Sequence, residues 1–145
     1  MSRVYLITAD KPLPLCDKQV ERTKTAKVKD KLFTITAEAG FAVREHNYYR
    51  YAVDDLGLMM KPYQYELELE VHEDDLADLK AYLEMHFAPG EDAELWNLWV
   101  GTDRLGAVPH FRAQLSGLDM AALTQFVQPP YPDGGIGQCR MTVTI

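Results

Sequence analysis

The segment from Gln64 to Phe87 constrains the fold more than any other part of the chain, because its apolar period changes without an intervening loop. From Tyr65 to Val71 apolar residues alternate with glutamates, a period of two that is typical of a strand with one buried and one wet face. From Leu76 to Phe87 the apolar residues recur at helical spacing and form one stripe. The segment therefore predicts a strand that runs almost directly into a helix.

The composition is that of one folded domain. The chain has 145 residues, of which 47% are hydrophobic and 10% aromatic, enough to bury a core without a metal or a disulfide. Its net charge of −7 argues against a general nucleic-acid binder, which is normally basic. We therefore expect a single domain over residues 1–145 that does not bind nucleic acid.

The sequence shows neither a signal-peptide pattern nor a membrane span. Val4–Ala9 is too short for the core of a signal peptide, and no stretch approaches the roughly 20 apolar residues of a membrane-spanning helix. Cys16 and Cys139 lie far apart, outside any CxxC spacing, and are expected to remain reduced. These features predict a soluble, cytoplasmic protein without a membrane partner.

The first 62 residues are rich in β-forming residues and poor in helical patterns. A tight turn is expected at Ala39-Gly40, between two of the predicted strands. We predict that residues 1–62 form hairpins that extend or cover the sheet of the remaining chain. The predicted strands are Arg3–Ala9, Leu32–Glu38, Phe41–His46 and the β-prone run Tyr48–Val53.

From residue 63 onward the patterns predict strand, helix, strand, strand, helix and strand, the order of a ferredoxin-like βαββαβ unit. We therefore predict an α+β fold whose core, residues 63–145, is a four-stranded antiparallel sheet with two helices on one face. The first strand is expected between the third and the fourth. The segments after Phe87 are Glu94–Val100, Val108–Leu115, a helix opened by a capping box at Ser116–Asp119, and Gln138–Ile145.

The predicted sheet has a charged open face. Glu66, Glu68 and Glu70 alternate with the predicted core positions, and their mutual repulsion requires compensation, for which Arg112 and Arg140 on flanking strands are candidates. The face is either a solvated, salt-bridged surface or a recognition surface for a cationic segment or ligand. Modules of this topology that bind RNA stack bases on aromatic residues at these positions, so the glutamates argue against that mode.

The segment Lys18–Lys31 is the one basic region of this acidic chain. It is a solvated loop or lysine-protected strand edge, or a source of sequence-independent phosphate contacts. The hypothesis we prefer is that it folds back toward the carboxylates of Glu66–Glu94.

No catalytic or metal-binding motif is present in the sequence. The four histidines do not occur at metal-ligand spacing, and neither cysteine has an obvious local base. We therefore predict no catalytic residue, no metal and no cofactor.

The candidate binding residues lie mainly in a tyrosine-rich segment. Five of the eight tyrosines fall between Tyr48 and Tyr65. Tyrosine and arginine are enriched at interfaces, although tyrosine is equally suited to strand packing. The candidate ligand- or partner-binding residues are His46, Tyr48, Tyr49, Arg50, Tyr51, His110 and Arg112.

Three functions remain open at this stage. The first is a non-enzymatic protein-interaction or self-associating module, for example a homodimer, with Trp96, Trp99 and Tyr48–Tyr51 as apolar anchors. The second is a small-molecule-binding domain or small enzyme whose site, between the N-terminal hairpins and the sheet, uses His46 with His110 and Arg112. The third is an acidic inhibitor whose carboxylate face binds a basic partner.

Overall fold

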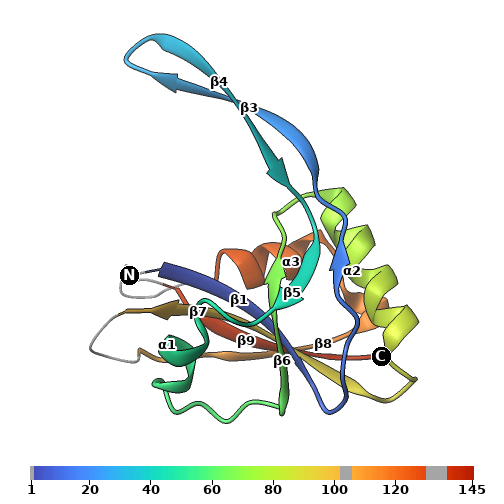
Figure 1. Ribbon diagram of the computed structural model, residues 1–145. Coiled ribbons are helices and arrows are strands. Elements are labelled where there is room, and N and C mark those ends of the chain that lie inside the picture. The colour runs from blue at the N-terminus through green and yellow to red at the C-terminus, as the bar shows by residue number, and fades with distance from the viewer. Residues whose placement is uncertain (1, 102–105, 130–136) are drawn as a thin grey trace.

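A computed structural model describes residues 2–101, 106–129 and 137–145 of the chain. Within these residues the fold is α+β, as predicted, with three α-helices, a mostly antiparallel seven-stranded sheet and a separate two-stranded hairpin (Figure 1). In spatial order the sheet contains β2 (Cys16–Asp17), β5 (Ala42–Glu45), β6 (Tyr63–Glu68), β1 (Ser2–Ala9), β7 (Asp92–Val100), β9 (Cys139–Thr144) and β8 (His110–Gln114). The other elements are the hairpin strands β3 (Val20–Val28) and β4 (Lys31–Ala39), the helices α1 (Arg50–Asp54), α2 (Glu73–His86) and α3 (Met120–Val127), and a 3₁₀ turn at Leu115–Gly117.

The centre of the sheet is formed by β1 and β7, which are covered on both faces. Leu6 and Ile7 of β1 point to opposite faces, and neither has any exposed surface. Leu6 packs with Leu98 on one side, whereas Ile7 packs with Leu95 on the other. Both strands read as nearly continuous apolar runs in the sequence, the pattern of strands that are buried on both faces.

The helices α2 and α3 cover one face of the sheet (Figure 1). Leu79 and Leu83 of α2 and Leu123 and Phe126 of α3 are at most 1% exposed and belong to the main core. The predicted strand and helix in the Gln64–Phe87 segment are therefore confirmed as β6 and α2.

The opposite face is covered in part by α1, in the segment Tyr48–Val53 that was predicted to be a strand. That prediction was wrong. Tyr49, Ala52, Val53 and Leu56 follow one another at helical spacing and pack together against the second face of the sheet. Burial of this stripe outweighs the β propensity of the tyrosines, because tertiary packing overrides a weak local preference.

The strand order differs from a ferredoxin-like arrangement, which is not confirmed. The first strand of the predicted unit, β6, lies between β5 and β1, and not between β8 and β9 as expected. The N-terminal strand β1 is inserted between β6 and β7 and pairs antiparallel with both. The last strand, β9, pairs antiparallel with β7 and parallel with β8. The N-terminal part of the chain therefore contributes its strand β1 to the centre of the sheet and its strands β5 and β2 to one edge.

The hairpin β3–β4 extends away from the body of the molecule (Figure 1). It continues the ribbon formed by β2 and β5 in unchanged register, since Asp17 lies opposite Ala42 and Val20 lies opposite Ala39. The ribbon bends at Gly40, whose φ is 138° and where a Cβ atom would lie 3.2 Å from the backbone of Lys18. The predicted strand Leu32–Glu38 is confirmed as β4, but the tight turn is not at Ala39-Gly40. It is at Lys29-Asp30, where both residues have positive φ values.

Candidate functional site

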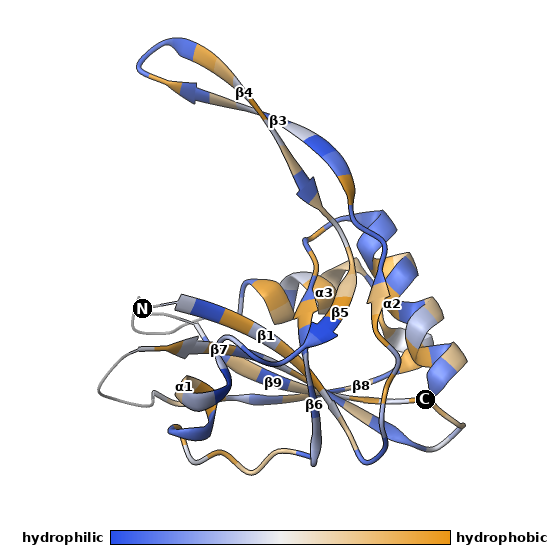
Figure 2. Ribbon diagram, in the orientation of Figure 1, coloured by the Kyte–Doolittle hydropathy of each residue, from blue (hydrophilic) through white to orange (hydrophobic). Residues whose placement is uncertain are grey.

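The hairpin β3–β4 is an exposed arm. Its strands have nine residues each and span about 30 Å at the usual rise per residue. An isolated two-stranded hairpin is at best marginally stable in water, and a protein normally buries its large apolar side chains. Figure 2 shows hydrophobic positions along the whole arm. Its most exposed apolar side chains are Leu32 (72%), Ile35 (58%), Val20 (55%), Val28 (54%) and Phe33 (48%).

The two faces of the arm differ in chemistry. Residues directly opposite each other in an antiparallel pair point to the same face, so the register defines both faces. The face that we call the apolar arm face carries Phe33 opposite Ala26 and Ile35 opposite Lys24. The reverse face is dominated by threonines, including a contact of 3.0 Å between the hydroxyls of Thr23 and Thr36. The apolar arm face consists of Val20, Arg22, Lys24, Ala26, Val28, Lys31, Phe33, Ile35, Ala37 and Ala39.

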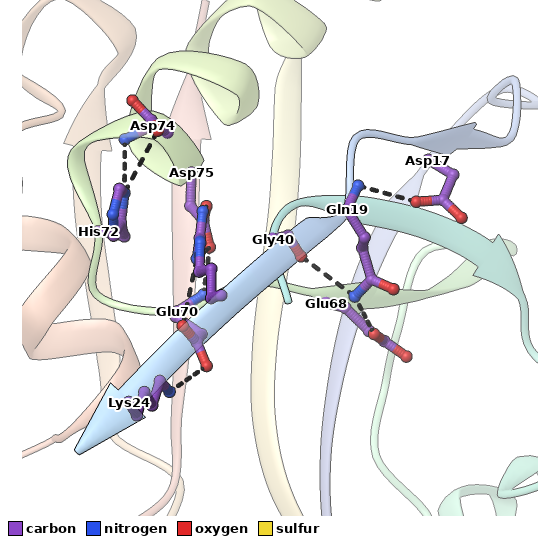
Figure 3. A network of polar contacts seen from close by, with 10 residues as sticks. Asp17, Gln19, Lys24, Gly40, Glu68, Glu70, His72, Asp74 and Asp75 are labelled. Carbon is purple, nitrogen blue, oxygen red and sulfur yellow. Dashed lines mark hydrogen bonds and ion pairs between the residues drawn. The ribbon is translucent and has the colours of Figure 1, made fainter. Parts of the chain in front are cut away.

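The base of the arm is fixed to the body by a polar network (Figure 3). Asp75, in the first turn of α2, is fully buried and accepts hydrogen bonds from Arg22 at 2.5 Å and from the backbone N–H of Glu70 at 2.6 Å. Lys24 donates to the Glu70 carboxylate at 2.6 Å, and Arg22 reaches the same carboxylate at 3.1 Å. Gln19, which directly precedes β3, donates to Glu68 of β6 at 2.6 Å.

The ionisation of this network follows from its contacts. Hydrogen bonds from Lys24, supported by Arg22, hold the pKa of Glu70 below its ordinary value despite partial burial. The hydrogen bond with Asp75 raises the pKa of Arg22. The base of the arm is therefore held by charged groups at neutral pH.

Beyond Lys24 the arm is unsupported. In the described part of the chain, no side chain from Thr25 to Thr36 makes a hydrogen bond or ion pair with the body, and Lys27 lies 3.9 Å from Asp30 of its own turn. The hypothesis that Lys18–Lys31 folds back onto the carboxylates therefore agrees with the contacts of the arm's base but not with its distal half.

Two of the candidate residues from the sequence, His46 and Arg50, line one cavity of about 290 Å³. Tyr49 packs against the second face of the sheet, whereas Tyr48, just before α1, and Tyr51 of α1 are 84% and 82% exposed. The other lining residues of the cavity are Asp54, Pro62, Tyr63, Gln64 and Tyr65.

The remaining candidates, His110 and Arg112, lie on β8, separated from β5 by four strands. They do not share a site with His46. Arg140 donates to Nδ1 of His110 at 2.8 Å, and Nε2 of His110 lies 2.7 Å from the Thr142 hydroxyl. Burial, together with the charges of Arg140 and Arg112, lowers the pKa of His110.

The compensation expected for the open-face glutamates comes from different residues. Because β1 and β7 separate β6 from β9 and β8, Arg140 pairs with Glu94 at 3.4 Å and not with the glutamates of β6. Glu68 is instead paired with Arg44 of β5 at 2.9 Å. Burial and the neighbouring Glu68 raise the pKa of Glu66.

Trp96, expected as an apolar anchor, is only 3% exposed and donates to Thr8, so it belongs to the core.

The sequence interpretation also missed the arm as a unit. The sequence signal that could have predicted β3 is the run from Val20 to Val28. In this run threonines and lysines occupy the positions that apolar residues fill in a buried strand. A search for apolar periodicity does not detect such a strand.

No protein-family model, curated protein or solved structure compared with this chain matches it. None of the helices in the described ranges has the length and apolar character that a membrane crossing requires. Among the same residues there is no group of three or more histidine, cysteine, aspartate or glutamate side chains arranged to hold a metal ion.

Proposed function

We propose that this protein is a self-associating interaction module that binds a second copy of itself through the hairpin β3–β4. The observation that carries the proposal is the apolar arm face, which is exposed over its distal half while its base is fixed to α2 by a buried ion pair. Contiguous exposed apolar surface on a soluble protein marks an interaction site. A projecting element with a fixed base presents that surface in a defined orientation.

Charge favours a second copy as the partner. Residues 20–39 contain five cationic and three acidic side chains, a net charge of +2, in a protein whose net charge is −7. The rest of the chain therefore carries −9. A basic arm and an acidic body within one molecule are complementary between two copies, and such complementarity favours association and fixes its orientation.

Nucleic acid is the less favoured partner for the same arm. Of its five cations, Arg22 and Lys24 are already paired with carboxylates of the body, and Lys27 lies near Asp30. Few cations remain for phosphate contacts, and the acidic body opposes the approach of a polyanion.

The test is the mass of the protein in solution as a function of concentration, measured by sedimentation equilibrium. The wild-type protein is expected to move from 16.5 kDa toward twice that mass as its concentration rises. The double variant Phe33→Ser/Ile35→Ser, which removes the two largest apolar side chains from the apolar arm face, is expected to stay monomeric. The matched control Thr34→Ser/Thr36→Ser changes the reverse face of the same strand and is expected to associate like the wild type.

A wild-type protein that stays monomeric at high micromolar concentration would overturn the proposal, as would a Phe33→Ser/Ile35→Ser variant that still associates. Tight, salt-sensitive binding of a labelled DNA or RNA duplex that is lost in Lys29→Glu/Lys31→Glu would assign the arm to nucleic acid instead. A third variant, Tyr48→Ser/Tyr51→Ser, tests whether the exposed tyrosines in and just before α1 receive the arm of the second copy.

A further inference from the structure

A second candidate site, distinct from the arm, is lined by residues of α1, of β6 and of the segments next to these elements. The cavity of about 290 Å³ is formed by residues from the end of β5, the start of β6 and α1. It is smaller than the cavities that hold drug-sized ligands, so it suits a small molecule. His46 follows β5, Arg50 and Asp54 come from α1, and Tyr63 and Tyr65 come from β6.

His46 is a buried polar group without a partner. Its side chain is 4% exposed, and neither ring nitrogen has a hydrogen-bond partner among the residues that the structure describes. Buried polar atoms are nearly always paired, and an imidazole that has no partner and belongs to a cavity-lining residue is free to turn toward a ligand. Burial and the nearby Arg50 lower the pKa of His46, so the ring is neutral at pH 7 and offers one donor and one acceptor.

Arg50 and Asp54 supply opposite charges to the same cavity. They are four positions apart on α1, with the cation before the anion, which is the less favourable order for pairing along a helix. Neither side chain forms an ion pair with the other or with any further described residue. Both nevertheless lie close enough to His46 to act on its ionisation in opposite directions.

We propose that this cavity binds a small zwitterion of the α-amino acid class, with its carboxylate on Arg50, its ammonium on Asp54 and a polar group against His46. A simple anion would be repelled by Asp54, and a simple cation by Arg50. A ligand that carries both charges satisfies both side chains with charge-assisted hydrogen bonds. The two ring nitrogens of His46 are shielded from solvent, so contact with them requires the ring to turn toward the cavity.

The test is a nuclear magnetic resonance titration of the full-length ¹⁵N-labelled protein with each of the standard α-amino acids. At least one is expected to cause saturable shifts of the backbone amides around the cavity and of the His46 ring nitrogens. For that amino acid, the amide derivative lacks the carboxylate and the N-acetyl derivative lacks the ammonium. Each derivative is expected to bind about tenfold more weakly or worse, because each loses one charge-assisted contact.

Variants of Arg50 and Asp54 test whether these two side chains bind the charged groups of the ligand. Arg50→Gln and Asp54→Asn are each expected to weaken binding by about tenfold or more. The matched controls are Asp55→Asn, next to Asp54 but outside the cavity lining, and Arg112→Gln on β8, and both are expected to bind like the wild type. Absence of saturable shifts with every amino acid would overturn the proposal. So would equal binding of the derivatives, or shifts confined to residues away from His46.

Discussion

The guanidinium of Arg22 in β3 lies against the carboxylate of Asp75 in α2, with Nη2 2.5 Å from Oδ1, and this pair joins the arm to the body. Asp75 is fully buried, and the Arg22 side chain is 13% exposed. The same carboxylate accepts the Glu70 N–H and lies in the first turn of α2, where the helix dipole favours negative charge. One buried side chain thus connects the arm, the end of the β6 segment and a core helix.

Replacement of one partner of this pair is expected to be costly. Arg22→Met leaves the Asp75 carboxylate buried without its cation and is expected to lower the free energy of unfolding by about 2 to 4 kcal/mol. This loss is slightly smaller than the loss from breaking a fully buried pair, because the Arg22 side chain is partly exposed. Urea denaturation measures this loss. Hydrogen exchange in β3 and β4 is expected to accelerate in the same variant, because the arm loses its anchor.

The control for Arg22→Met is Lys24→Met on the same face. The Lys24 side chain is 64% exposed, so its ion pair with Glu70 is expected to contribute no more than about 1 kcal/mol. In the double variant Arg22→Met/Asp75→Asn, the loss is expected to be smaller than the sum of the two single losses, since the two residues act as a unit. Strictly additive losses would show that the pair is not coupled.

The turn of the arm offers a second prediction, which is a gain in stability and not a loss. Lys29 and Asp30 have φ values of 50° and 64°, a conformation that favours Asn-Gly in two-residue hairpin turns. Lys29→Asn/Asp30→Gly is expected to stabilise the arm by about 1 kcal/mol, because it removes strain from the left-handed region. The measurement is slower hydrogen exchange at the paired amides of β3 and β4. Asp30→Ala is expected to have the opposite effect, since alanine tolerates this conformation less well than aspartate, and a faster exchange in the Asn-Gly variant would contradict the argument.

Much of the fold was predictable wherever one local period dominates. The change of period in the Gln64–Phe87 segment predicted β6 and α2, and the apolar run Arg3–Ala9 predicted β1. The position of β1 was not predictable, because strand order depends on long-range pairing, and a strand buried on both faces fits many places in a sheet. The expectation that β6 is central failed for this reason.

The candidate sites were predictable only in part. His46 and Arg50 were identified from the tyrosine-rich segment and do share a cavity, but Asp54 was missed because the segment was interpreted as a strand and not as a helix. The arm was missed for a different physical reason. Its strands are stabilised by cross-strand pairs of threonine, lysine and β-branched residues, so their alternation is not one of apolar against polar residues.

The N-cap of α3 provides a third prediction. The sequence suggested a capping box that starts at Ser116, but the structure places Asp119 at the N-cap, where its carboxylate accepts from the Ala122 N–H at 2.9 Å. Asp119→Ala is therefore expected to lower the free energy of unfolding by about 1 kcal/mol. Ser116→Ala, in the preceding 3₁₀ turn, is expected to change it by less than about 0.5 kcal/mol. Thermal or urea denaturation of the two variants distinguishes the two positions, and a larger loss for Ser116→Ala would favour the box predicted from the sequence.

The buried histidine makes the stability dependent on pH. Burial, with Arg50, lowers the pKa of His46 below 6.5, whereas the unfolded chain titrates near that value. As the pH falls through about 6.5, the unfolded state therefore binds a proton before the folded state does, and the free energy of unfolding decreases until the folded pKa is reached. Above about pH 6.5 this histidine does not change how the free energy of unfolding depends on pH. The expected result is a wild-type stability that declines as the pH falls below about 6.5, and a smaller decline in His46→Asn, both measured by urea denaturation. His86→Gln, which removes a histidine outside the cavity, is the reference variant. A ring titration that places the pKa of His46 at or above 6.5 would contradict both the burial of the neutral ring and the pH dependence derived from it.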